Sequence, residues 1–222
     1  MVHFTLFGIP VYIRPSFWVV LAIFGGALSI SSVEDLIYPA LFVIAGFVAI
    51  LSHEMGHALV GRKLGGGQQT IVLELFGGLT SSHGMQLTRG GRALMILAGP
   101  MMTLLLGIIS LGLTWNIVAP VMTSYNLNFW DLAISPFTAA LISPKLYILS
   151  CLIMIGEWWT ILNLLPIYPL DGGQLIAQYI RSPRKGFMTG FITAILIGLL
   201  SFQLFHGYFI PIFMALFAYS NY

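Results

Sequence analysis

LSHEMGHAL, residues 51–59, contains the pattern HExxH and decides how the rest of this chain is interpreted. On an α-helix, residues four apart share one face, so His53 and His57 can hold one metal ion while Glu54 lies beside them as a general base. This layout is typical of zinc hydrolases. The structural alternative is a pair of helix histidines that serve packing alone.

The setting of this motif is apolar. Residues 36–51, which lead into it, contain no charged side chain. Ionisable groups at membrane depth are costly and indicate function, and three within five residues are hard to explain by packing. The whole chain is 58% hydrophobic and 7% charged, against roughly 25% charged residues in soluble domains. The composition therefore predicts an integral membrane protein and gives no support for nucleic-acid binding.

The single cysteine excludes two kinds of site. Cys151 has no second cysteine to pair with, so the chain has neither a disulfide framework nor a cysteine-based metal cluster. Any metal must be held by histidine and carboxylate. Residues 1–15 lack the basic segment, apolar core and cleavage site of a signal peptide, so we expect the first apolar span to be retained.

Apolar segments predict an α-helical integral membrane protein with about six transmembrane helices. The connection at residues 120–144 carries Tyr125, Phe129 and Trp130, aromatic residues suited to the membrane interface. The last segment is short for a crossing. The six predicted spans are residues 16–32, 36–60, 93–119, 146–165, 187–205 and 208–219.

Two regions predict a small β-sheet or hairpin near the cytoplasmic face. Residues 4–14 are rich in β-formers and too short to cross a bilayer, which favours a strand or hairpin at the surface. Residues 70–76 form a strand-like run, and Gly77-Gly78 predict a turn into a return strand at 79–82. A plain surface loop is the alternative for this second region.

The basic residues predict the orientation. On the six-span arrangement only Lys145 falls on one side, and the positive-inside rule makes the opposite side cytoplasmic. We therefore expect a multi-pass protein of the cell membrane with both termini in the cytoplasm and HExxH near the cytoplasmic face. The basic residues on that face are Arg14, Arg62, Lys63, Arg89, Arg92, Arg181, Arg184 and Lys185.

A catalytic zinc site needs a third protein ligand. Asp171 is the best candidate, because it lies near the predicted cytoplasmic end of the fourth span and Gly172-Gly173 allow a tight backbone turn there. Its alternative role is the N-cap of a helix at residues 172–180. Glu157, about two turns deeper, is the rival ligand, and a structural carboxyl is the interpretation that we favour for it.

Four motifs together resemble the site-2 protease family of intramembrane zinc metalloproteases. They are HEMGH at 53–57, FGG at 76–78, AGP at 98–100 and NLLPIYPLDGG at 163–173. The resemblance covers nearly the whole chain, from FGIPVYIRPSFW at 7–18 onward. One departure is Thr103, where members of the family often carry asparagine three residues after the Gly-Pro pair.

The resemblance implies a role for each motif. His53, His57 and Asp171 would bind one Zn²⁺ per chain, and Glu54 would be the general base. Asn163 would stabilise the oxyanion. The hairpin at Phe76, Gly77 and Gly78 would hold substrate as an added strand. Neither a PDZ nor a CBS module is expected in the chain, so residues 1–222 would form a single transmembrane metalloprotease core, either a minimal member or a trimmed one.

The implied function is hydrolysis of peptide bonds in or near transmembrane helices of membrane-protein substrates, within the lipid bilayer. One alternative is a catalytically silent membrane protein that binds client helices, against which the intact HExxH and Asp171 argue. Another is a metal transporter, which would need polar residues on several spans across the full depth of the membrane. The predicted outer half is almost wholly apolar, which favours the protease.

Overall fold

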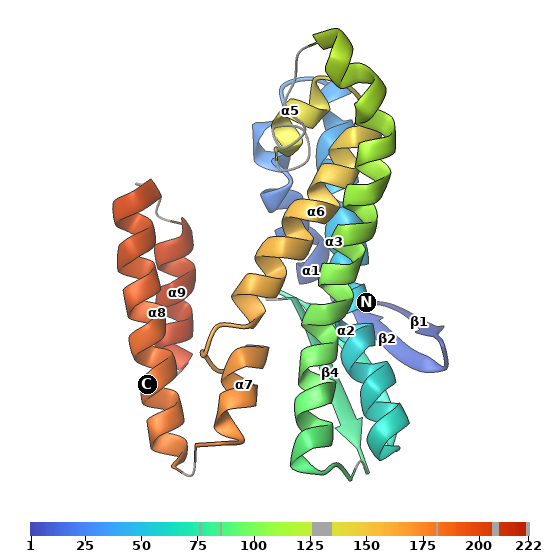
Figure 1. The fold of residues 1–222 in the computed structure, drawn as a ribbon. Coiled ribbons are helices and arrows are strands. Elements are labelled where there is room, and N and C mark those ends of the chain that lie inside the picture. Colours follow the sequence, from blue (N-terminus) through green and yellow to red (C-terminus); the bar gives the residue numbers. More distant parts are fainter. Residues whose placement is uncertain (76, 85, 126–134, 181, 206–208, 221–222) are drawn as a thin grey trace. The chain divides into compact units, whose positions relative to one another are not determined.

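A computed structural model describes residues 1–222 except 76, 85, 126–134, 181, 206–208 and 221–222 (Figure 1). The chain separates into two compact units, Met1–Thr160 and Ile161–Tyr222. Each unit has buried apolar residues of its own and is considered separately below.

The first unit contains a four-stranded sheet in the order β1-β2-β3-β4. β1 and β2 pair antiparallel, β2 and β3 pair parallel, and β3 and β4 pair antiparallel. Alternate residues of β2 and β3, including Val11 and Ile71, are fully buried, as expected for strands with one face on a core. The strands are β1 Val2–Leu6, β2 Ile9–Ile13, β3 Gln68–Glu74 and β4 Gly77–His83.

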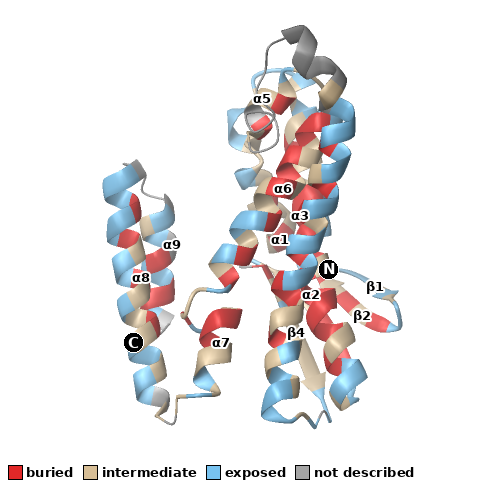
Figure 2. Ribbon diagram, in the orientation of Figure 1, coloured by how far each residue is buried: buried red, intermediate tan, exposed pale blue. Residues whose placement is uncertain are grey.

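Helix α2, Ile37–Gly65, is the centre of this unit. It packs on the sheet and on α1 through one apolar cluster that includes Phe17, Ile50 and Met55. Residues 53–58 of α2 are buried without a break (Figure 2). The other helices are α1 Pro15–Phe24, α3 Arg89–Tyr125, α5 Pro136–Ala140 and α6 Pro144–Asn163, with short 3₁₀ turns at Ala27–Ser29 and Glu34–Leu36.

Helices α2 and α3 approach each other closely at Gly56. A Cβ atom at Gly56 would lie 2.4 Å from the carbonyl oxygen of Ala98, which leaves no room for any side chain. Close backbone approach at small residues is the usual way in which membrane helices gain packing energy. The HExxH turn is therefore pressed against the Ala98-Gly99-Pro100 segment of α3.

The second unit contains α7 Asp171–Ala177, α8 Pro183–Phe205 and α9 Phe209–Ser220. Ile167, Ala194, Met214, Phe217 and Ala218 form its buried apolar cluster. The segment before α7 folds tightly, since a Cβ atom at Gly172 would lie 2.2 Å from the Leu164 carbonyl oxygen.

Among the described residues, four helices are long and apolar enough to cross a membrane, namely Glu34–Gly65, Arg89–Ile117, Pro144–Asn163 and Arg184–Leu204. Two shorter apolar helices lie at Pro15–Phe24 and Ile210–Tyr219. Large apolar side chains such as Ile108 and Ile109 are more than half exposed on α3, as expected for residues that face hydrocarbon. The prediction of a helical membrane protein with a small sheet is thus confirmed, and the count of six spans remains a prediction.

Several predicted boundaries were wrong. The first span was expected to reach residue 32, but α1 ends at Phe24, where Gly25 and Gly26 follow and Gly26 adopts a positive φ of 88°. The loop expected from residue 120 is helical up to Tyr125, since membrane helices tolerate interior proline where neighbouring groups satisfy the backbone. Phe129 and Trp130 lie outside the described residues.

The predicted hairpin after residue 65 is confirmed and the surface-loop alternative is wrong, but its turn lies elsewhere. Gly77 and Gly78 were expected to form the turn, yet both belong to β4 and pair with Glu74 and Leu73. The N-terminal hairpin is also confirmed. Its parallel pairing with β3 was not predicted, because it joins segments about sixty residues apart.

Candidate metal centre

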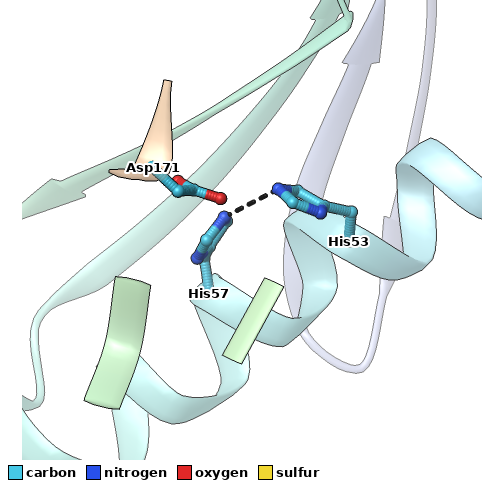
Figure 3. Close-up of side chains that lie close together, drawn as sticks. All are labelled: His53, His57 and Asp171. Atoms are coloured by element: carbon cyan, nitrogen blue, oxygen red, sulfur yellow. Dashed lines mark hydrogen bonds between the residues drawn. The ribbon is translucent and has the colours of Figure 1, made fainter. Parts of the chain in front are cut away.

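His53 and His57 lie one helical turn apart on α2 and point at each other (Figure 3). Their side chains are 2% and 7% exposed, and their Nε2 atoms are 3.1 Å apart. Two nitrogen ligands on one tetrahedral zinc ion, each about 2.0–2.1 Å from it, are separated by about 3.3–3.4 Å. The two imidazoles are thus already spaced as ligands of a single ion.

The opposite nitrogen of each imidazole has its own partner. Nδ1 of His57 lies 2.8 Å from the carbonyl oxygen of Met95. A carbonyl only accepts, so Nδ1 must carry the proton and donate, which leaves the Nε2 lone pair for a metal. Nδ1 of His53 lies 3.0 Å from Oγ1 of Thr103, whose hydroxyl is also 3.0 Å from the Gly99 carbonyl oxygen.

Gly99 keeps the space beside both Nε2 atoms open. A Cβ atom at Gly99 would lie 2.2 Å from Nε2 of His57 and 2.9 Å from Nε2 of His53. Any side chain there would occupy the position from which the two imidazoles reach an ion. A steric requirement beside the two histidines thus explains why the Ala98-Gly99-Pro100 segment has glycine at position 99.

Glu54 is held by strand β4. Its side chain is 5% exposed, and its Oε2 accepts a hydrogen bond of 2.7 Å from the hydroxyl of Thr80. Gly78 lies two residues earlier on the same face of β4, and a Cβ atom there would come 2.2 Å from Cγ of Glu54. Strand β4 thus fixes the orientation of the buried Glu54 carboxylate, which follows His53 directly in the sequence of α2.

Asp171 is the first residue of α7 in the second unit and is 6% exposed. Its predicted N-cap role is wrong, because the N-cap is Leu170 and α7 ends at Ala177. Asp171, His53 and His57 are each buried, and each side chain offers one atom of a kind that binds metal ions. Two imidazoles and a carboxylate, all buried, match the donor set of catalytic zinc sites.

The remaining predicted site residues have varied positions. Asn163 is buried at the last residue of α6. Gly77 is buried at the start of β4, where a Cβ atom would lie 2.6 Å from the ring of Trp159. Phe76 lies outside the described residues. Glu157 is exposed on α6 and belongs to no metal-binding group within the described part of the chain.

Sequence reasoning missed the residues that support the ligands and the base. Thr80, Thr103 and the Met95 carbonyl are separated from their partners by 26, 50 and 38 residues. No short motif links residues so far apart. The one available signal was Thr103, which stood out as a departure at its position three residues after the Gly-Pro pair.

Comparison with known proteins gives concordant matches. Residues 41–206 match the profile of Peptidase family M50. Zinc metalloprotease MJ0392 of Methanocaldococcus jannaschii is 29% identical over 186 residues, which are 83% of this chain and 46% of that protein. The protein sll0528 of Synechocystis is 28% identical over 188 residues, 79% of this chain and 43% of its own length. This chain therefore spans less than half of these curated relatives.

A solved structure shares the fold. The site-2 protease from Methanocaldococcus jannaschii superposes with a TM-score of 0.63 and 23% sequence identity. The match covers 99% of this chain and 93% of that chain.

Proposed function

This chain belongs to peptidase family M50, and on that premise we propose that it is an intramembrane zinc metalloprotease. It hydrolyses peptide bonds in or near transmembrane helices of membrane-protein substrates. The observation that carries the proposal is the buried pair His53 and His57, with Nε2 atoms 3.1 Å apart, next to Glu54 on a membrane-length helix. Packing alone would not place three ionisable side chains there.

His53, His57 and Asp171 hold one zinc ion per chain. The proposal is supported by the donor chemistry of the three residues, by their burial and by the 3.1 Å separation of the two Nε2 atoms. The backbone carbonyl on His57 Nδ1 further favours a metal-binding Nε2. When bound, zinc polarises the scissile carbonyl and makes water more acidic.

Glu54 acts as the general base and then as the general acid. It takes a proton from the attacking water and returns it to the leaving amine. The Thr80 hydroxyl engages Oε2, which fixes the orientation of the carboxylate. The Asn163 side-chain amide donates to the oxyanion of the tetrahedral intermediate, a role supported by its burial beside the segment that leads to Asp171.

Strand β4 supplies the substrate platform, together with the residues Phe76, Gly77 and Gly78 before and at its start. β4 is the last strand of the described sheet, so an extended peptide can add to its outer edge. A transmembrane helix hides its peptide bonds in intrahelical hydrogen bonds and must unwind before cleavage. Pairing with β4 gives those backbone groups new partners.

The protein resides in the cell membrane, with its active site toward the cytoplasm and both termini cytoplasmic. Arg62 and Lys63 in the last turn of α2, about one and a half turns beyond His57, support this orientation. Six crossings require the two shorter apolar helices to span the membrane as well as the four helices of membrane length. Residues 1–222 form one protease core.

The first test is Glu54→Gln, which removes the base and keeps the size of the side chain. Cleavage of a single-span test substrate in detergent or vesicles should fall below detection while zinc content, measured by mass spectrometry, stays near one per chain. Cleavage that persists in Glu54→Gln would remove Glu54 from its role. If the parent protein binds test helices and zinc but cuts none of them, the silent client-binding alternative is favoured.

A further inference from the structure

We propose that Thr103 is a positioning residue of the zinc site, and this inference rests on the proposed function. The Thr103 hydroxyl holds His53 in the tautomer that presents Nε2 to the metal. Its Oγ1 lies 3.0 Å from Nδ1 of His53 and 3.0 Å from the carbonyl oxygen of Gly99.

The direction of these hydrogen bonds follows from the chemistry of the three atoms. The Gly99 carbonyl only accepts, so the Thr103 hydroxyl hydrogen points to it, and a lone pair of Oγ1 then faces His53. That lone pair can be matched only by an N–H at Nδ1. A neutral imidazole with its proton on Nδ1 has its lone pair on Nε2, the form that binds a metal.

Because the site is buried, another acceptor cannot easily take the place of the Thr103 hydroxyl. Thr103 is 0% exposed and His53 is 2% exposed. Helix α6 packs against the same turn of α3, because a Cβ atom at Gly156 would lie 3.0 Å from the Thr103 carbonyl oxygen. If the hydroxyl were lost, the Nδ1 proton of metal-bound His53 would have no acceptor at this position. A buried donor without a partner disfavours the metal-binding tautomer.

The two histidines thus receive the same support from different groups. His57 donates to the Met95 carbonyl and His53 donates to the Thr103 hydroxyl, and both groups belong to α3. One helix therefore sets the tautomer of both imidazoles on α2. Only the second of these contacts depends on a side chain, so only Thr103 can be tested by substitution.

The test measures zinc affinity of the purified full chain by competition with a chelator of known affinity. Thr103→Val keeps the shape of the side chain and removes the hydroxyl, and we expect its zinc affinity to fall about tenfold, the lower end of the effect of losing an outer-shell partner. Thr103→Ser restores the hydroxyl and should bind zinc within about twofold of the parent.

Thr114→Val is the matched control. Thr114 is also 0% exposed on α3, and its hydroxyl donates to the Ser110 carbonyl four residues earlier, as Thr103 does to Gly99. The Thr114→Val substitution should lower thermal stability by about as much as Thr103→Val does. Its zinc affinity should equal that of the parent.

The outcomes separate the two proposals. Zinc binding to the parent with weak binding only in Thr103→Val supports the inference. Equal affinity in Thr103→Val and the parent contradicts it, as does a Thr103→Ser variant that binds as weakly as a protein without the hydroxyl. If Thr103→Val does not fold, Thr103→Ala, which also lacks the hydroxyl, takes its place in the comparison with Thr103→Ser. A parent protein that binds no zinc contradicts the proposed function instead.

Discussion

At the scale of single residues, the chemistry of the site depends on hydroxyl groups that contact the reactive side chains. The buried Glu54 carboxylate accepts a hydrogen bond from Thr80, and buried His53 contacts Thr103. The hydrogen bond to the Glu54 carboxylate is charge-assisted, and such bonds are shorter and stronger than neutral ones. Both contacts fix the orientation of the proposed base and of a proposed ligand before substrate arrives.

Thr80→Val tests the support of the base. Loss of a hydrogen bond to a charged group costs about 1.5–3 kcal/mol, so cleavage of a single-span substrate should slow by about tenfold or more. Zinc content should not change, because Thr80 contacts Glu54 rather than a proposed ligand. Thr80→Ser should cleave at close to the parental rate. Parental activity in Thr80→Val would show that the contact has no catalytic role.

The sequence predicted the residues whose spacing carries the signal. His53, Glu54 and His57 could be identified from the sequence because they lie within one helical turn of each other. The choice of Asp171 over Glu157 rested on predicted depth and orientation and stays a prediction, while Glu157 is exposed on α6. Thr80 and Thr103 could not be predicted as partners, since their contacts depend on how β4 and α3 pack against α2.

At the scale of elements, the centre depends on two segments pressed against α2. Strand β4 reaches Glu54 through Gly78, and α3 reaches both histidines through Gly99. In each place glycine allows a backbone approach that a Cβ atom would block. The apolar and β-rich runs predicted most helices and the hairpins, whereas the parallel pairing of β2 with β3 arises only in the folded chain.

Gly99→Ala tests the close approach of α3 to the two histidines. A Cβ atom at this position would lie 2.2 Å from Nε2 of His57, so we expect most bound zinc to be lost. Gly112→Ala on the same helix is the control, because a Cβ atom there meets nothing within 4 Å. Zinc content of both purified variants is the measurement. Full zinc occupancy in Gly99→Ala would contradict the steric role of Gly99.

At the scale of the whole molecule, the proposed ligands come from both compact units. His53 and His57 belong to Met1–Thr160, and Asp171 belongs to Ile161–Tyr222. An ion that binds only the folded chain stabilises it, so bound zinc should raise the thermal stability of the protein. The class of helical membrane protein followed from the sequence. The division into two units did not, since the chain was expected to form a single core.

The most direct measurement is the zinc content of the purified protein beside His57→Ala, Asp171→Ala and Glu157→Ala, with cleavage of a single-span substrate measured in parallel. We predict near one zinc per chain in the parent and in Glu157→Ala, since Glu157 is exposed and outside the metal-binding group. His57→Ala and Asp171→Ala should lose both zinc and cleavage. A parent that holds no zinc after reconstitution, or an Asp171→Ala variant that retains zinc and activity, would contradict the proposed centre.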